Sequence, residues 1–355
     1  MVVKNCKVSL GMSANTEIRY AFDSRSENNH MLLLGISGSG KSTQLECMES
    51  DVINFGKKII EFDFSDSSFA KASLAKQSRT INIRNDSSIS PLIKRCNVYG
   101  QLEDTVDFSK RITDLLSGAL RFKALQQSLL YDAIKQASTG CNQITFSDIL
   151  DWLSLSDSTS AISIRMKLQY FADIKIFEGR EANGWQKLFQ HPKPIQILSL
   201  SGFRSDERKV IAELLLDDLR SYLVEYGPGQ NDFILVLDEC QNLRLTSGMP
   251  TSFFLSQGRK YGCGVWLATQ SPQYFKRDEL AQLYQPALIL NFQPNAEERS
   301  KICRKLAKDE KERKRLLEMF EQLGRGQFVA SGRFLKKSGI LSNRTHLLID
   351  NLHTL

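Results

Sequence analysis

The nine residues from Gly35 to Thr43 read Gly-Ile-Ser-Gly-Ser-Gly-Lys-Ser-Thr and match the spacing G-x-x-x-x-G-K-[ST] at every fixed position. The apolar run at 31–34 precedes them, and apolar residues at helical spacing follow from Ser42. The glycines allow the backbone to wrap closely around an anion, and the N-terminus of the helix adds N–H donors. The predicted phosphate-binding loop consists of Gly35, Ser37, Gly38, Ser39, Gly40, Lys41, Ser42 and Thr43.

Two members of this loop have specific expected roles. Lys41 should reach the β- and γ-phosphates of a nucleoside triphosphate, and the Ser42 hydroxyl should ligate Mg²⁺. A second apolar run at 233–237 ends in an Asp-Glu pair. Asp238 would hold Mg²⁺ through water, and Glu239 would orient and activate the attacking water. The sequence therefore predicts an ATPase that uses Mg²⁺.

Apolar runs and helical periodicities alternate along much of the chain. Further strand-like runs occupy residues 58–63, 195–200, 264–268, 287–291 and 327–331. Helical spacing of apolar residues follows the phosphate-binding loop and returns over 208–226. Strands that alternate with helices form a parallel sheet with helices on its faces. We therefore expect an α/β fold with a mostly parallel central sheet and helices on both faces.

Residues 100–190 differ from their surroundings, because long helical patterns replace the strand-like runs there. They predict an all-α insertion within one catalytic fold, although 355 residues suggest about two domains by length alone. The expected organisation is an N-terminal β hairpin over 1–29, a first core part over 30–99, the insertion over 100–190 and a second core part over 191–355. The last part includes a charged helical segment at 296–323 and a final strand before a polar C-terminal tail.

Composition is that of an ordinary soluble protein. Hydrophobic residues make up 41% and charged residues 25%, which excludes collagen-like, wholly disordered and disulfide-scaffold chains. No apolar run approaches the ~20 residues that a membrane helix needs, and the N-terminus lacks the apolar stretch of a secretory signal. Seven scattered cysteines without a C-x-x-C pair indicate reduced thiols. We expect a cytoplasmic protein.

The net charge of +7 permits binding to a polyanion without demonstrating it. Nine basic and five acidic residues between 297 and 315 supply +4 of that excess. A solvated helix with interspersed opposite charges is the favoured interpretation of this segment, and a nucleic-acid surface is the alternative.

Polar Gln270 follows the next buried strand, where side chains point into the crevice in which open α/β sheets bind ligands. Together, GISGSGKST (35–43), LVLDECQNL (235–243) and GRKYGCGVWLATQSP (258–272) resemble the HerA/FtsK superfamily of P-loop ATPases. The resemblance implies a RecA-like P-loop NTPase fold that usually forms hexameric rings with ATP between neighbours. It also places Gln270 at the position that senses the nucleotide, and Arg259 at that of an arginine finger reaching the adjacent subunit's ATP.

Many members of this superfamily move double-stranded DNA through the pore of the ring, so the resemblance implies a homo-hexameric DNA translocase. An arginine supplied by a neighbour would make hydrolysis depend on ring assembly. Lysines and arginines on loops that face the pore would grip DNA phosphates without reading sequence. The candidate DNA contacts are Arg204, Arg208, Lys209 and Arg244.

Two other functions fit the same motifs. One is an ATPase of conjugation or type IV secretion that acts on a membrane assembly, and the other is a nucleotide-dependent regulatory subunit without motor activity. Residues 1–29 are too few to form the N-terminal β barrel of HerA-type helicases. We therefore expect a motor core that works with another protein, and the resemblance suggests a nuclease in DNA processing or phage defence.

Overall fold

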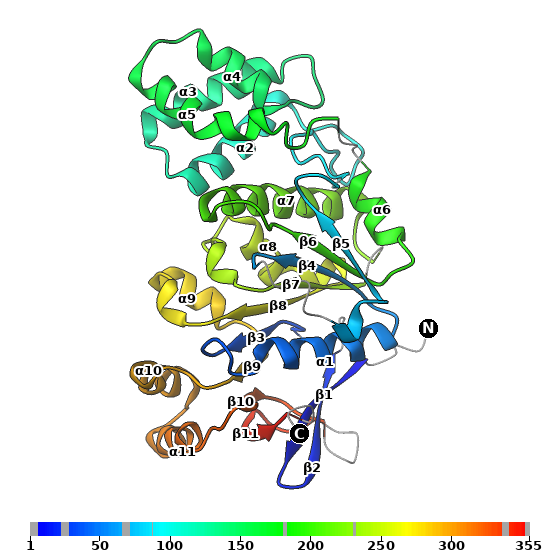
Figure 1. Cartoon of the computed structure of the whole chain (residues 1–355), viewed down its shortest axis with the longest axis vertical. Coiled ribbons are helices and arrows are strands. Elements are labelled where there is room, and N and C mark those ends of the chain that lie inside the picture. The colour runs from blue at the N-terminus through cyan, green and yellow to red at the C-terminus, as the bar shows by residue number, and fades with distance from the viewer. Residues whose placement is uncertain are drawn as a thin grey trace.

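The computed structural model describes residues 6–22, 28–65, 72–86, 88–179, 183–229, 232–335 and 341–351. These residues form a sheet of eleven strands in the order β2-β1-β11-β10-β9-β3-β8-β7-β4-β6-β5 (Figure 1). The strands are β1 (Cys6–Ser13), β2 (Thr16–Phe22), β3 (Met31–Leu34), β4 (Lys58–Asp63), β5 (Ser78–Asn82), β6 (Ile195–Ser199), β7 (Phe233–Leu237), β8 (Cys263–Thr269), β9 (Leu288–Asn291), β10 (Gln327–Gly332) and β11 (Thr345–Asp350).

Eleven α-helices accompany the sheet in the described ranges. They are α1 (Lys41–Asn54), α2 (Thr105–Leu120), α3 (Ala124–Ala137), α4 (Phe146–Ser154), α5 (Thr159–Asp173), α6 (Gly184–Gln190), α7 (Ser205–Tyr226), α8 (Pro250–Gln257), α9 (Arg277–Leu283), α10 (Ala296–Leu306) and α11 (Glu310–Glu321). No helix in the described part of the chain is both long and apolar enough to cross a bilayer.

The strands from β9 to β5 in this order pair in parallel, which confirms the predicted mostly parallel sheet. Successive side chains of β3 enter different apolar cores, as the pleat of a strand requires. Leu32 and Leu34 join a core that includes residues of α7 and α8, whereas Met31 and Leu33 join one that includes residues of α1. Helices therefore cover both faces, as predicted.

The N-terminal hairpin extends this sheet. β1 and β2 pair antiparallel through a turn at Ala14 and Asn15, whose φ angles of 45° and 64° suit a tight hairpin turn. β1 also pairs with β11, and Gly11 lies so close to that strand that a Cβ would be 2.1 Å from the Asp350 carbonyl oxygen. The expectation of a polar C-terminal tail was wrong for residues 345–350, because β11 forms there.

The charged segment at 296–323 is helical, but it forms two helices rather than one. Asp309 begins α11 by accepting a 2.8 Å hydrogen bond from the Glu312 N–H. One side of each helix is apolar, and Ile302 of α10 and Phe320 of α11 share a small core with β10. Packing thus fixes the segment at the β10 side of the sheet, while most of its charged residues remain exposed or half-buried.

Helices α2 to α5 cluster together beyond the β5 end of the sheet, next to α7 (Figure 1). They lie within the predicted insertion, whose limits stay a prediction together with the division of the core. Local caps begin three of these helices: the side chains of Asp104, Thr145 and Ser158 each accept a backbone N–H at the N-terminus of α2, α4 and α5.

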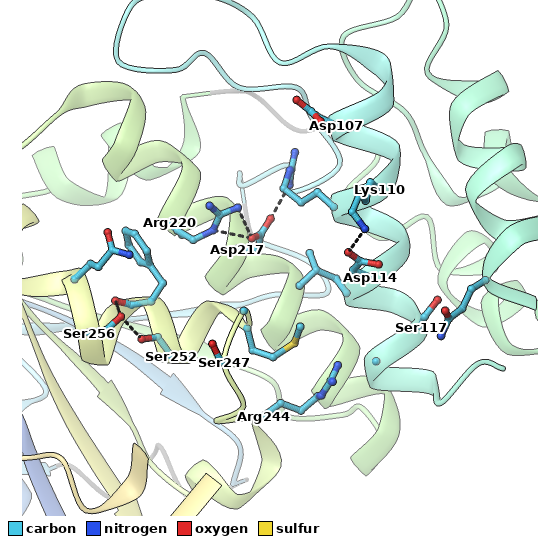
Figure 2. A pocket seen from close by; sticks show the side chains of 18 residues that line it. Asp107, Lys110, Asp114, Ser117, Asp217, Arg220, Arg244, Ser247, Ser252 and Ser256 are labelled. Carbon is cyan, nitrogen blue, oxygen red and sulfur yellow. Dashed lines mark hydrogen bonds and ion pairs between the residues drawn. The ribbon is translucent and has the colours of Figure 1, made fainter. Parts of the chain in front are cut away.

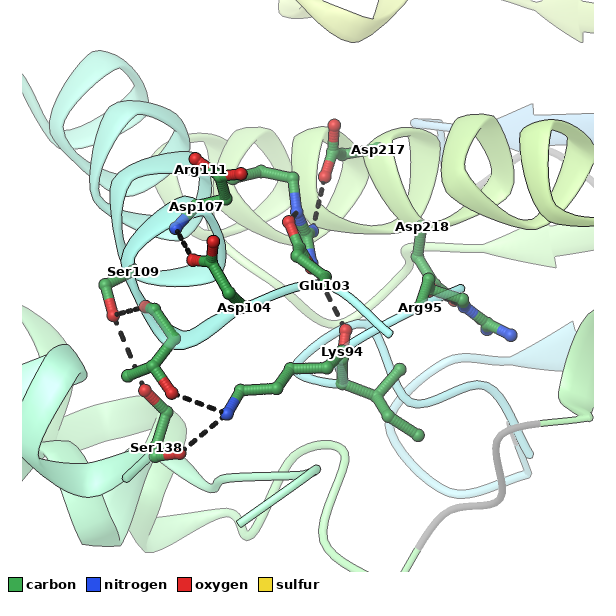
Figure 3. Close-up of polar contacts among 12 residues, drawn as sticks. Lys94, Arg95, Glu103, Asp104, Asp107, Ser109, Arg111, Ser138, Asp217 and Asp218 are labelled. Carbon is green, nitrogen blue, oxygen red and sulfur yellow. Dashed lines mark hydrogen bonds and ion pairs between the residues drawn. The ribbon is translucent and has the colours of Figure 1, made fainter. Parts of the chain in front are cut away.

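Two consecutive carboxylates of α7 form buried ion pairs, Asp217 with α2 of this helical cluster and Asp218 with the segment before α2 (Figure 3). Arg95 donates to Asp218 from Nε at 2.8 Å and from Nη2 at 3.0 Å, and the Trp185 indole N–H donates to the same carboxylate at 2.8 Å. Arg111 of α2 pairs with Asp217 at 2.6 Å. Because these ion pairs are buried, removing one partner leaves the charge of the other partner buried without a counter-ion.

We expect Asp218→Ala to lower the free energy of unfolding by about 3–5 kcal/mol, since it leaves the Arg95 guanidinium buried without its bidentate partner. Asp114→Ala is the matched control, because the Asp114 side chain is 56% exposed in its pair with Lys110. That variant should lose no more than about 1 kcal/mol. Urea denaturation followed by circular dichroism measures both. Equal midpoints for the two variants would show that the buried pair of Arg95 and Asp218 does not stabilise the fold.

Candidate nucleotide-binding site

The predicted phosphate-binding loop follows β3, between β8 and β9. The neighbouring segments hold its start, because the Gly35 N–H donates to Thr269 O at 3.3 Å and the Ile36 N–H to Gln293 O at 3.1 Å. A Cβ at Gly35 would lie 2.6 Å from the Cβ of Phe292, so only glycine fits there. The loop is therefore closely packed where it leaves the sheet.

Some residues of the loop are buried and fix its position, whereas others are exposed to solvent. Gly35 is buried, and Ser39 is buried with its hydroxyl donating to Ile36 O at 2.7 Å. The exposed members are Ser37, Gly38, Ser42 and Thr43. Gly40 has a φ of 107°, and a Cβ there would lie 3.3 Å from Gly326 Cα. Phosphate can thus reach the loop from one side while the other side is fixed by packing.

Lys41 points into this loop. Its ammonium donates to the carbonyl oxygens of Gly35 at 2.6 Å and Ile36 at 2.9 Å. Burial lowers the pKa of Lys41, and the carboxylates of Asp238 and Glu239 oppose that shift. The cation therefore lies at the loop, with the two carboxylates near enough to act on it.

Three carboxylates lie at the C-terminal ends of two neighbouring strands, β4 and β7. Leu237 of β7 pairs with Phe62 of β4, so Asp238 and Asp63 leave the sheet side by side. Burial raises the pKa of Glu239, as do the charges of Asp238 and then Asp63, while Arg208 and Lys41 lower it. Glu239 has a φ of 51°, a left-handed conformation that is uncommon for a side chain of its size and turns the chain sharply at the strand end.

Asp63 is a site residue that our sequence reasoning missed. It is 4% exposed, its Oδ1 accepts hydrogen bonds from the N–H and hydroxyl of Ser65, and its Oδ2 has no partner in the described residues. The available signal was a carboxylate at the end of a buried strand. Nothing in the local sequence showed that β4 lies beside β7, and this pairing is what brings Asp63 to the site.

These groups fit a magnesium ion. The Ser42 hydroxyl is exposed beside the loop, and Asp238 and Asp63 supply carboxylate oxygens at the same edge of the sheet. No three His, Cys, Asp or Glu side chains of the described residues are grouped to hold a metal by themselves. Mg²⁺ bound to nucleotide needs no such cage, because phosphate oxygens and water complete its octahedron.

Gln270 lies where the sequence predicts it. Thr269 of β8 pairs with Leu34 of β3, so half-buried Gln270 leaves the sheet beside Gly35. The next residue is anchored, because the Ser271 hydroxyl donates to the carboxylate of buried Glu298. The Gln270 segment is thus fixed between the phosphate-binding loop and the carboxylates of β7.

Two of the four candidate DNA-contact residues do not lie on free loops. Arg208 donates from Nε to Phe203 O at 2.7 Å and from Nη1 to Phe64 O, so it ties together the chain after β4 and β6 near Glu239. Arg244 packs against α2, where a Cβ at Gly118 would lie 1.4 Å from its Nη1. We had expected both on free loops, but tertiary contacts occupy Arg208 and enclose Arg244.

The other two candidates remain accessible. Arg204 is exposed immediately before α7, and its N–H donates to the Glu207 carboxylate at 2.7 Å. Lys209 is half-buried, and its ammonium lies 3.9 Å from Asp206. Their contact with DNA stays a prediction.

Arg259 lies at the opposite edge of the sheet. It belongs to the short helical turn Gly258–Tyr261, which precedes β8, and it is exposed. Burial lowers the pKa of His30, which stands just before β3, to about 4, and the charge of Arg259 adds to that shift. Since β8 spans seven residues, roughly 20 Å of strand separate this edge from the phosphate-binding loop. An arginine side chain cannot cover that distance, so Arg259 cannot serve the site of its own chain.

Buried carboxylates also fix the chain that follows Glu239. Glu213 of α7 accepts the Arg244 N–H at 2.9 Å, and Glu279 of α9 accepts the Leu245 N–H at 3.2 Å. Burial raises the pKa of Glu213 to about 7, while Arg244 opposes the shift and Asp217 and Glu279 add to it. The position of this segment thus depends on α7 and α9.

Comparison with known proteins yields a family and a set of similar structures. Residues 8–219, more than half of the 355 residues, match the family described as helicase HerA, central domain. No curated protein matches the chain.

The similar structures cover nearly the whole chain. VirB4 of Thermoanaerobacter pseudethanolicus is 15% identical with a TM-score of 0.70, over 97% of this chain and 96% of that one. The bacterial conjugative coupling protein TrwBΔN70 is 12% identical with a TM-score of 0.66, over 99% and 89%. The plasmid coupling protein TrwB with ADP and Mg²⁺ is 12% identical with a TM-score of 0.64, over 96% and 88%. These similarities confirm the RecA-like P-loop fold.

We expect Glu213→Gln to stabilise the protein increasingly as the pH rises. The folded-state pKa of about 7 lies above the ordinary glutamate pKa of 4.5, so the folded protein favours the protonated carboxyl. The wild type therefore loses stability relative to the variant between about pH 4.5 and 7, and the difference levels off above that range. The plateau should be on the order of 2–3 kcal/mol.

Urea denaturation of both proteins at pH 5, 6, 7 and 8 gives this difference directly. Glu207→Gln serves as the control, because Glu207 is a half-buried carboxylate at the start of the same helix. A stability difference that does not change with pH for Glu213→Gln would show that its carboxylate is solvated.

Proposed function

Because the chain belongs to the family of the helicase HerA central domain, we propose that it is an ATP-hydrolysing motor that forms a homo-hexameric ring and moves double-stranded DNA. ATP and Mg²⁺ are its cofactors, in agreement with the ADP and Mg²⁺ complex of the similar protein TrwB. The observation that carries the proposal is the separation of Arg259 from the phosphate-binding loop, at opposite edges of one sheet.

In the proposed site, the chain's own residues divide the work of hydrolysis. Lys41 would move from the loop carbonyls to the β- and γ-phosphates, and Ser42 and Asp238 would hold Mg²⁺, which would supply positive charge to neutralise the phosphates. Glu239 accepts a proton from the attacking water, a role for which a pKa raised by burial makes it a better base. Gln270 touches the γ-phosphate from the end of β8.

Arg259 would complete the site of the adjacent subunit. An exposed cation at one edge and an open phosphate-binding face at the other suit head-to-tail contact between copies, which closes into a ring when the rotation allows it. The guanidinium would stabilise charge on the transferring phosphoryl group. Hydrolysis in each site would then depend on its neighbour.

Arg204 and Lys209 are the DNA contacts that we retain. They lie on the same side of the fold as the nucleotide site, at the start of α7, whose Arg208 approaches Glu239. A change at the nucleotide could therefore be passed to them through one helix. Their grip on phosphates would need no base contacts.

A second candidate is a motor that acts on a membrane assembly, as in conjugation or type IV secretion. The similarity to VirB4 and to the conjugative coupling protein TrwB over nearly the whole chain favours it. A regulatory subunit without motor activity, for example one that controls a nuclease, is the third. All three share the nucleotide site and differ in what stimulates it.

We expect purified protein to hydrolyse ATP with Mg²⁺, to do so faster with duplex DNA, and to have six times the mass of one chain by native mass measurement. Glu239→Gln should lower kcat at least about 100-fold while the protein still binds nucleotide. Raising the salt concentration should weaken DNA binding steeply. Absence of ATPase activity with DNA present contradicts the proposal. Stimulation by membrane proteins without DNA binding would favour the secretion motor.

Mixing two inactive variants tests the position of Arg259. Arg259→Ala and Lys41→Ala subunits should each be inactive, but Arg259→Ala should still bind ATP. In mixed rings, an intact loop from the first can meet an intact arginine from the second, at about one interface in four for an equal mixture. ATPase activity should therefore return on mixing. If it does not, while native mass measurement shows mixed rings, Arg259 does not act between subunits.

A further inference from the structure

A second cavity, of about 810 Å³, opens where α2 meets α7 and α8 (Figure 2). The chain after β7, from Arg244 to Met249, forms part of its wall. No residue of the phosphate-binding loop lines it, so it is separate from the nucleotide site. Its volume lies in the range of small-molecule sites in proteins, about 300–1,000 Å³.

The charges around this cavity are balanced except at one place. Three of its four basic side chains already pair with carboxylates of the lining: Lys110, Arg111 and Arg220. Arg244 differs from them. Among the described residues, no carboxylate lies within ion-pair distance of its guanidinium, and its buried Nη1 has no hydrogen-bond partner. A half-buried guanidinium that forms no ion pair can pair with an anion from solution.

The wall beside Arg244 is shaped to receive its guanidinium. A Cβ at Gly118 of α2 would lie 1.4 Å from Nη1 and 2.6 Å from Cζ, so the guanidinium rests on the bare backbone of that helix. Glycine weakens a helix interior, and here its lack of a side chain makes room for the cation. Neighbouring Ser117 also lines the cavity; it is 4% exposed, and its hydroxyl has no hydrogen-bond partner in the described part of the chain.

We propose that this cavity binds a phosphorylated small molecule of about mononucleotide size, with its phosphate held by the nitrogens of the Arg244 guanidinium other than the buried Nη1. The planar guanidinium presents paired N–H donors that match two phosphate oxygens. The hydroxyls of Ser247, Ser252 and Ser256 line the rest of the cavity and can bind polar groups of the ligand. This inference does not depend on the proposed motor function.

The site is placed to influence nucleotide hydrolysis. Arg244 follows Glu239 on the short segment after β7, and the backbone of that segment is held by Glu213 of α7. A ligand that pairs with Arg244 would fix this segment more firmly between α2 and α7. The concentration of a phosphorylated metabolite would thus affect the position of Glu239 through binding in this cavity.

The test is calorimetric titration of the full chain with inorganic phosphate, pyrophosphate and AMP in a Lys41→Ala background, which disables the phosphate-binding loop. At least one probe should bind, and Arg244→Gln should weaken that binding about tenfold or more, because charge-assisted hydrogen bonds are lost. Gly118→Ala should do the same, since the new methyl group displaces the guanidinium while every charge is kept. Arg121→Gln is the matched control and should bind as before, because Arg121 is exposed at the C-terminal end of α2 and does not line the cavity.

Gly118→Ala also guards against misfolding, because alanine favours a helix and circular dichroism can confirm that the fold is kept. Failure of all three probes to bind overturns the proposal. So does binding that is unchanged in both Arg244→Gln and Gly118→Ala. A short duplex DNA that binds through Arg244 when the small phosphates do not would also overturn it, because the site would then serve a polymer.

Discussion

The parallel pairing of β4, β7, β8 and β3 is the constraint on which the candidate site depends. Parallel strands end at one edge, so segments far apart in the chain deliver their polar residues to the same place. The phosphate-binding loop, Gln270, the Asp238-Glu239 pair and Asp63 leave the sheet there in that spatial order. A slip of one residue in any of these pairs would move a carboxylate to the other face of the sheet. The buried apolar side chains on both faces prevent such a slip.

α7 connects this edge to the rest of the molecule. Its 22 residues span about 33 Å, and Arg208 near Glu239 lies about 14 Å along it from Asp217, which pairs with Arg111 of the helical cluster. Glu213, between them, holds the chain that follows β7. A helix of this length moves largely as one body, and its buried ion pairs resist separation from either partner. The nucleotide site, the helical cluster and the cavity beside Arg244 therefore share one rigid element.

The catalytic motifs could be predicted because their chemistry requires particular residues in a short stretch. Motif spacing predicted the role of Lys41, and a continuous apolar run that ends in an Asp-Glu pair predicted that of Asp238. The position of Asp63 could not be predicted, because it depends on which strand lies beside β7. Nor could the environments of Arg208 and Arg244, since Arg208 donates to a carbonyl of a distant segment and Arg244 packs against the backbone of α2. β11 was missed because only some of its residues are buried, so its apolar pattern is weak.

The pairing of β1 with β11 has a consequence for the order of folding. The two strands belong to residues 6–13 and 345–350, so their contact joins almost the full length of the chain. During synthesis the hairpin of β1 and β2 emerges before the other strands of the described sheet, and β11, which attaches it to them, emerges after them. Contacts between residues so far apart in the sequence form slowly, because the chain loses the entropy of closing a large loop before the contact energy is gained. This edge of the sheet should therefore be the last part of the fold to assemble on the ribosome, after the nucleotide site is already in place.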